Sequence, residues 1–296
     1  MSIDFQCKAY GKWILVGEHS VLRGVPALVF PLQSRYLELQ YSLAESGPLQ
    51  LRLQGDHGSD LQMLIWSVLD RACQLKSIQR SDLKGSLYLE SSIPVGAGMG
   101  ASAALCVALT RWLGFLGFVA ESEYYEFARQ LENLFHGESS GVDIAVALSG
   151  EGLHFVRDGE RRPLKMAWSP RWYISYSGQK GVTKEAVNKV KDFIRHHPDQ
   201  GQFLDRQMAE AVKVAEKALS ENSSSSFENL ARAIEQAGAC FQSWGLNEGP
   251  PSQHIQWLRE QGAVAVKPTG SGGGGYVLSL WSKAPPDSIQ NMLIPS

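Results

Sequence analysis

The strongest chemical signal in this sequence is a glycine-rich segment at residues 94–104. It reads Pro-Val-Gly-Ala-Gly-Met-Gly-Ala-Ser-Ala-Ala, and it links a predicted strand at 86–89 to an apolar helix predicted over 102–113. Alternating glycines let the backbone adopt positive φ and approach a ligand closely, and the N–H groups at a helix start attract anions. The spacing favours phosphate binding, with a tight strand-to-helix turn as the alternative interpretation. The segment contains no Gly-Lys-Ser/Thr, which excludes a Walker A loop.

A second glycine-rich segment lies near the C-terminus, at 267–275. Five of the six positions from Gly270 to Gly275 are glycine, and ordering so many glycines costs chain entropy on folding. A hairpin needs only one or two glycines, so the excess indicates a backbone that fits closely around another group. A flexible hairpin is the alternative.

Three charged or polar side chains flank a short apolar strand predicted at 13–16. Lys12 precedes this strand, and Glu18 and His19 follow it. Residues of these types at a strand end are suited to hydrogen-bond a polar substrate. Taken alone, they are more typical of a solvated strand end.

Further acidic residues are grouped between positions 132 and 143. Glu132 and His136 are four residues apart and therefore share a helix face. Two ligands are too few for a structural zinc site, whereas one carboxylate suits Mg²⁺, which keeps several waters and binds phosphate oxygens. Asp143 precedes an apolar segment at 144–148. It could act as a general base there, although its position alone favours a helix N-cap.

The hydrophobic periodicity predicts a mixture of strands and helices. The predicted strands are 13–16, 27–32, 36–43, 49–53, 86–89, 150–156, 164–168, 172–176, 263–266 and 276–281. The predicted helices are 60–75, 102–113, 121–135, 184–196, 203–219, 227–241 and 252–261. Ser169-Pro170 is a plausible hinge. We therefore expect an α+β chain with domains at 1–168 and 169–296, each built on a mainly antiparallel sheet.

The composition narrows the function classes. The chain has 296 residues with 44% hydrophobic and 20% charged residues, which is ordinary for a globular protein and excludes a coiled coil or a disordered tail. The formal net charge of −2 provides no field that would attract nucleic acid or an anionic membrane. The four cysteines form no Cys-x-x-Cys motif, and the N-terminus has no apolar signal-peptide core. These features predict a cytoplasmic protein with no membrane span and no nucleic-acid partner.

Together, the segments at 8–24, 94–104 and 267–275 resemble, in order, the three motifs of the GHMP kinase superfamily, and they span nearly the whole chain. Gly17-Glu18-His19-x-Val21-x-x-Gly24-x-Pro26-Ala27 and His136-Gly137-x-x-Ser140-Gly141-x-Asp143 resemble the forms found in its mevalonate kinases. Galactokinases are similar but carry Asp-Tyr-Asn after Glu-His. The resemblance implies a two-domain α+β fold, with an N-terminal, ribosomal-protein-like βα domain that binds ATP and a C-terminal ferredoxin-like domain.

The resemblance also implies an activity and a set of site residues. The activity is ATP- and Mg²⁺-dependent phosphorylation of the 5-hydroxyl of mevalonate in isoprenoid biosynthesis. Asp143 and Lys12 are the implied catalytic residues, and Ser102 and Glu132 are the implied Mg²⁺ ligands. The implied ATP-binding residues are Pro94, Gly96, Ala97, Gly98, Met99, Gly100, Ala101 and Ser102. The implied mevalonate-binding residues are Glu18, His19, Thr183 and Gly270.

Some positions depart from the family pattern, and some alternatives stay open. Tyr10 stands where proline is usual, Ala101 replaces the first serine of the usual pair, and Glu151 follows Gly150 where a second glycine is usual. A phosphomevalonate kinase or another small-molecule kinase of the superfamily is the main alternative, and Lys180 and Lys184 could supply the extra positive charge that a phosphorylated substrate requires. A non-catalytic, metabolite-binding relative is a third possibility, but such relatives tend to lose the aspartate or the lysine. The sequence leaves a homodimer open.

Overall fold

The computed structural model describes residues 2–54, 58–136 and 139–296 of the chain. Its contacts divide the chain into two compact units. Unit 1 comprises Met1–Lys12, Pro31–Val95 and Met99–Gly150, and unit 2 comprises Trp13–Phe30, Gly96–Gly98 and Glu151–Ser296. Strands β1 (Phe5–Val16) and β2 (Ala27–Ser42) contribute residues to both units. The domain boundary at 168/169 stays a prediction, and it is not where the contacts divide the chain.

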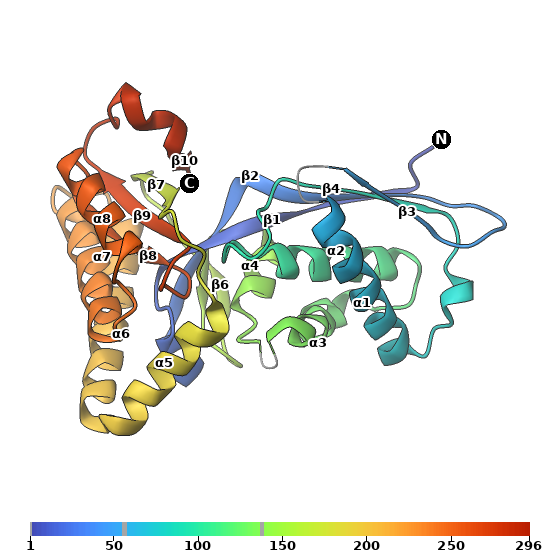
Figure 1. Ribbon diagram of the computed structural model, residues 1–296, viewed down its shortest axis with the longest axis horizontal. Coiled ribbons are helices and arrows are strands. Elements are labelled where there is room, and N and C mark those ends of the chain that lie inside the picture. Colours follow the sequence, from blue (N-terminus) through green and yellow to red (C-terminus); the bar gives the residue numbers. More distant parts are fainter. Residues whose placement is uncertain (1, 55–57, 137–138) are drawn as a thin grey trace. The chain divides into compact units, whose positions relative to one another are not determined.

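Unit 1 combines a strand layer with four helices (Figure 1). Besides its parts of β1 and β2, it contains β3 (Gln50–Gln54), β4 (Ser86–Ser91), α1 (Gly58–Lys76), α2 (Ala101–Phe115), α3 (Tyr124–His136) and α4 (Val142–Ser149). β2 pairs antiparallel with β4, from Leu37↔Ser91 to Ser42↔Ser86, and β3 pairs parallel with β4. α2 is apolar on nearly every side, because it is covered by α3 and α4 as well as by the other elements of the unit.

Unit 2 is built on an antiparallel sheet in the order β10-β7-β9-β8. Its elements are β5 (Leu153–Phe155), β6 (Arg161–Pro163), β7 (Arg171–Tyr176), α5 (Thr183–His196), α6 (Pro198–Ser220), α7 (Ser226–Ser243), α8 (Pro250–Glu260), β8 (Ala265–Thr269), β9 (Tyr276–Trp281) and β10 (Ile294–Pro295). α6 and α7 lie side by side, and α7 and α8 both pack on β8 (Figure 1). β5 pairs with the unit 2 part of β2, through Ala27↔Phe155, and with β6.

Every predicted helix is present, but two strand predictions need correction. The two runs predicted at 27–32 and 36–43 form the single strand β2. Residues 164–168 are not a strand: Ala167 N–H donates to the carbonyl of Leu219, and Trp168 Nε1 donates to that of Ala218.

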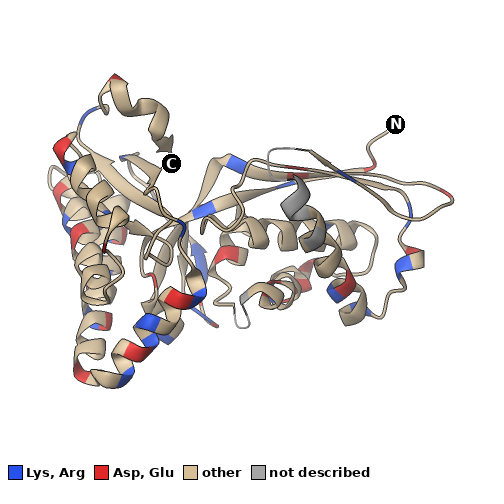
Figure 2. Cartoon of the chain, in the orientation of Figure 1, with Lys and Arg blue, Asp and Glu red and all other residues tan. Residues whose placement is uncertain are grey.

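The charged residues of the described chain are distributed in mixed sign. Figure 2 shows Lys and Arg interspersed with Asp and Glu along α5 and α6, and α2 carries only Arg111. No helix in the described ranges is both long and apolar enough to cross a bilayer.

Candidate active site

Two of the predicted site residues of unit 1 form a lysine–aspartate ion pair. Lys12 Nζ lies 3.1 Å from Asp143 Oδ1, and Lys12 is only 7% exposed. Lys12 lies on β1, and Asp143 lies in the first turn of α4, whose N-cap is Gly141. Asp143 is therefore not the N-cap, and the helix dipole at this end favours its carboxylate. The pair places a proton acceptor beside a fixed positive charge.

A second carboxylate, that of Glu132, is buried in the same unit. Glu132 lies near the end of α3, is 2% exposed and accepts a hydrogen bond from Ser139 Oγ. Burial, and then the negative charge of Asp143, raise the pKa of Glu132 to about 8. A buried carboxylate that is repelled by a second one is a favourable ligand for a cation, and oxygen ligands are those that Mg²⁺ takes. The donor set therefore fits the metal that the sequence implies.

The end of the first glycine-rich segment lies against Lys12. Gly100 is the N-cap of α2 and has φ +78°, and Lys12 N–H donates to the carbonyl of Met99 at 2.9 Å. A Cβ at Gly100 would lie 3.0 Å from Lys12 Cγ and 3.9 Å from Asp143 Oδ2. The position thus requires glycine both for its backbone conformation and for the space that Lys12 occupies. Ser102 follows in the first turn of α2.

We predict that Gly100→Ala destabilises the protein more than Gly117→Ala does. Both glycines have φ near +80°, where an alanine costs about 1–2 kcal/mol, but a Cβ at Gly117 meets no atom within 4 Å. The additional loss at Gly100 measures the contact with Lys12. Urea unfolding of both variants checks this expectation, and equal losses of unfolding free energy would contradict it.

In unit 2, His19 is held in a strained turn. Its φ of 55° and ψ of −47° are rare for a non-glycine residue, and Ser20 N–H donates to the carbonyl of Glu18 at 2.5 Å across it. His19 Nε2 lies 2.8 Å from the carbonyl oxygen of Ser271. Because a carbonyl only accepts, Nε2 carries the hydrogen and Nδ1 is left as an acceptor. The ring lies edge-on to Phe241 and Trp244, at 5.8 and 5.3 Å.

Burial makes His19 a neutral side chain at physiological pH. Loss of solvation, together with the charges of Arg23 and Lys267, lowers its pKa to about 4 although the bond to Ser271 opposes the change. His19 therefore suits a substrate hydroxyl rather than a carboxylate that needs a cation.

We predict that His19 makes stability fall below pH 6.5. Between pH 6.5 and 4 the unfolded chain protonates this residue and the native chain does not, so the free energy of unfolding decreases as the pH falls. Once the pH is below 4, the lowered pKa of His19 has reduced the free energy of unfolding by about 3 kcal/mol. Unfolding of wild type and His19→Gln at several pH values measures it as the difference between the two curves. Parallel curves from pH 7 to 4 would contradict the expectation.

Two further contacts join the end of β1 to the second glycine-rich segment. Lys267 and Glu18, which are 0% and 1% exposed, form a buried ion pair. Thr269 Oγ1 accepts a hydrogen bond from Ile14 N–H and donates one to the Ile14 carbonyl, both at 2.9 Å. The hydrogen bond between His19 and Ser271 is a third contact between these two segments. The two segments are thus connected at three points, although they lie more than 240 residues apart in the sequence.

The two glycine-rich segments also approach each other within unit 2. A Cβ at Gly275 would lie 3.4 Å from the carbonyl oxygen of Ala97, and one at Gly270 would lie 3.7 Å from that of Gly98. Ser271 Oγ donates to Thr183 Oγ1 at 3.4 Å, at the first residue of α5. The predicted residues Gly96–Gly98, Gly270 and Thr183 therefore belong to one neighbourhood.

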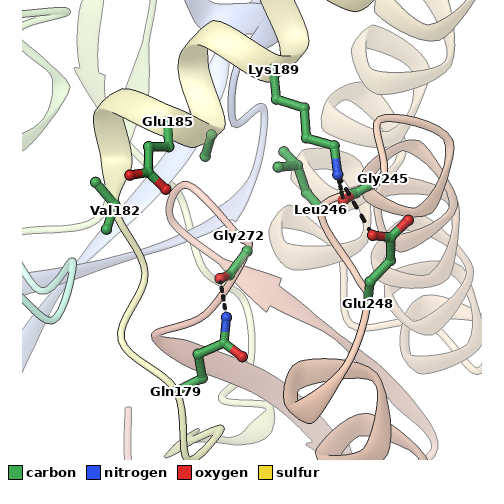
Figure 3. Close-up of a pocket in the computed structure, with 10 residues that line it drawn as sticks. Gln179, Val182, Glu185, Lys189, Gly245, Leu246, Glu248 and Gly272 are labelled. Carbon is green, nitrogen blue, oxygen red and sulfur yellow. Dashed lines mark hydrogen bonds and ion pairs between the residues drawn. The ribbon is translucent and has the colours of Figure 1, made fainter.

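A surface pocket of about 230 Å³ adjoins this neighbourhood at Gly272 and Gly273. Figure 3 shows Glu185 and Lys189 reaching into it from α5, opposite the 245–248 connection. Lys189 Nζ donates to the Gly245 carbonyl at 2.5 Å and lies 3.6 Å from Glu248. Since its lysine already has partners, the pocket contains no evident site for an anion.

The predicted site residues thus fall into two groups. Unit 1 brings together Lys12, Met99, Gly100, Glu132 and Asp143, and unit 2 brings together Glu18, His19, Gly96–Gly98, Thr183 and Gly270. Gly137, part of the motif around Asp143, lies outside the described residues.

Several residues beside the site carried no functional prediction. They are Ser139, Phe241, Trp244, Lys267 and Ser271, which bond to or pack against predicted site residues. Lys267 and Ser271 stand inside a recognised motif, so their positions gave a signal. The two aromatic residues gave none, because their role depends on a contact with His19, more than 220 residues away.

Comparisons with known proteins show which proteins this chain is similar to. The family model described as GHMP kinases N terminal domain matches residues 63–151. A mevalonate kinase from Thermococcus gammatolerans is 28% identical over 92% of this chain and 87% of its own length. One from Archaeoglobus fulgidus is 29% identical over 94% and 93%. The structure of L. major mevalonate kinase in complex with R-mevalonate has the same fold, with a TM-score of 0.79 and 22% identity over 95% of this chain and 88% of that one.

The fold, the matched domain and the relatives all lead to one family. The predicted two-domain α+β GHMP kinase fold is confirmed by the structural match. Residues 63–151 thus match a GHMP kinase N-terminal domain, and along nearly its whole length the chain is most like the mevalonate kinases.

Proposed function

We propose that this chain is an ATP-dependent kinase that transfers the γ-phosphoryl group of ATP to the 5-hydroxyl of mevalonate. The relatives that align along nearly the whole chain are mevalonate kinases. The observation that supports this most directly is the Lys12–Asp143 pair at 3.1 Å. It combines the two charges that an alcohol acceptor and a transferring phosphoryl group require.

Asp143 orients the substrate alcohol and accepts its proton. An alcohol is a poor nucleophile at neutral pH, so proton transfer to a positioned carboxylate assists its attack on phosphorus. The alcohol oxygen forms the new bond to the γ-phosphorus, the bond from that phosphorus to the bridging oxygen of ADP breaks, and the hydroxyl proton goes to Asp143. Lys12 balances the charge of Asp143 and stabilises the oxygens of the transferring group.

The remaining residues bind and orient the two substrates. We assign the 94–102 segment to the ATP phosphates, since positive-φ glycines and the start of α2 direct N–H groups outward. We assign Glu132 and Ser102 to Mg²⁺, which would neutralise the negative charge of the ATP phosphates when bound. Substrate hydroxyl binding is assigned to His19 and Thr183. The four cysteines carry free thiols, which suits the reducing cytoplasm.

A substrate screen tests the proposal. ADP release is measured with Mg-ATP and, in parallel, mevalonate, 5-phosphomevalonate, galactose and homoserine. We expect turnover with mevalonate, and ³¹P NMR of the product should show a phosphate monoester. Turnover with 5-phosphomevalonate alone would replace this proposal by a phosphomevalonate kinase, and would direct attention to Lys180 and Lys184, which are both exposed.

A further inference from the structure

Lys267 and Glu18 have no role in the transfer itself, yet they form the most deeply buried ion pair of the described residues. Both side chains are essentially inaccessible to solvent. Burying two charges carries a large desolvation penalty, and apolar replacements of similar volume are often at least as stable. Stability is therefore a weak explanation for an ion pair at this position.

The hydrogen bonds of the Lys267 ammonium are directed to specific groups. It donates to Glu18 Oε1 and, at 2.6 Å, to the carbonyl of Pro268. It also lies 5.2 Å from the centre of the Phe241 ring, a distance at which an ammonium is attracted to the aromatic face. The Lys267 ammonium thus connects Glu18, the residue before His19, to Pro268 at the start of the second glycine-rich segment.

Phe241 extends this connection to His19 itself. Its ring lies 5.8 Å from the His19 ring, and a Cβ at Gly272 would lie 2.8 Å from Phe241 Cδ1. The same aromatic side chain therefore supports the ammonium, the imidazole and the glycine-rich backbone. Moving any one of them disturbs the packing of the others.

His19 needs such support because its turn is strained. A non-glycine residue at φ 55° and ψ −47° is strained, and this conformation persists only where its surroundings impose it. Glu18 supplies the carbonyl that closes the turn, and Ser271 supplies the acceptor for His19 Nε2. Lys267 forms an ion pair with Glu18 and lies four positions before Ser271.

We infer that Lys267 and Glu18 are positioning residues: their ion pair holds His19 in its turn, with Nε2–H on Ser271 and Nδ1 as an acceptor for a substrate hydroxyl. The identity of that substrate rests on the proposed function. In this role Glu18 acts through His19 instead of touching the substrate, which differs from the contact that the family resemblance implies.

Two variants separate positioning from stability. Lys267→Met removes the ammonium and leaves the Glu18 carboxylate buried, whereas Glu18→Gln combined with Lys267→Met removes both charges. We expect the KM for mevalonate to rise at least 10-fold in both variants, with kcat changed less than the KM. The control is Ile289→Ala, which truncates a buried side chain in a separate cluster formed with Ile255, Leu258 and Trp281. It should lower stability and leave the KM unchanged.

NMR of the histidine side chains provides a readout that does not depend on activity. His19 is one of seven histidines, and its signals are assigned by their absence in His19→Gln. Wild type should show a neutral ring with the hydrogen on Nε2. Both variants should show a mixture of tautomers and a pKa closer to the ordinary value. If Lys267→Met does not fold, the double variant provides both measurements.

The outcomes separate this inference from the proposed function. Wild-type KM and unchanged His19 signals in the folded double variant would overturn the positioning role. A wild-type enzyme that does not phosphorylate mevalonate would overturn the proposed function, and the NMR comparison would still decide whether the pair holds His19.

Discussion

Asp143→Asn is expected to lower kcat about 10²–10⁴-fold while ATP binding is retained. Asparagine has nearly the same shape, but it cannot accept the proton of the substrate hydroxyl as a carboxylate does. It also removes the negative partner of Lys12, 3.1 Å away. The measurement is single-turnover phosphoryl transfer together with the Kd for ATP obtained by calorimetry.

A matched control for this variant is available on another helix. Asp199 also lies in the first turn of a helix, α6, and it is exposed. Asp199→Asn changes the same residue type at the same helical position, so it should retain wild-type kcat. If Asp143→Asn turned over within 10-fold of wild type, Asp143 would not be the proton acceptor.

Lys12→Met is expected to lower kcat about 10²–10³-fold, the usual effect of removing one preorganised electrostatic group. Two acidic side chains, Asp143 and Glu132, would lose the nearby positive charge that opposes their repulsion, since Lys12 lowers the pKa of Glu132. Lys12→Arg should not restore activity, because a planar guanidinium does not place a compact point charge 3.1 Å from Asp143 as the ammonium does.

Lys8→Met is the control for the lysine. Lys8 lies on the same strand, is 43% exposed and pairs with Glu38 at 3.2 Å. Exposed pairs contribute little to stability, so kcat should remain that of wild type. The measurement is the steady-state kcat of Lys12→Met, Lys12→Arg and Lys8→Met. Equal kcat values for Lys8→Met and Lys12→Met would show that Lys12 is not a catalytic residue.

Local sequence patterns predicted the helices better than the strands. Amphipathic or apolar periodicity extends over several turns in α5, α6 and α7, so the signal is strong within the segment itself. The segment at 164–168 has strand-like composition, but it bonds to the end of α6. Only the position of that helix, which is distant in sequence, could reveal this.

The predicted site residues divide in the same way. Lys12, Glu132 and Asp143 were predicted because they stand in motifs that few families share, and the structure brings them into one cluster. The N-cap alternative for Asp143 could be rejected only when Gly141 was seen at that position. Likewise, the neutral state of His19 depends on burial by Phe241 and Trp244 and on a bond to Ser271.

By itself, the sequence determined the resemblance to the GHMP kinases, the order of the three motifs and the types of residue available for phosphoryl transfer. These properties depend on residue identity and on spacing along the chain. Tertiary structure alone decided that Lys267 pairs with Glu18, that Gly100 makes room for Lys12 and that Glu132 holds its proton more tightly than an exposed glutamate. Such properties arise from burial and from contacts between distant segments, and both exist only once the chain has folded.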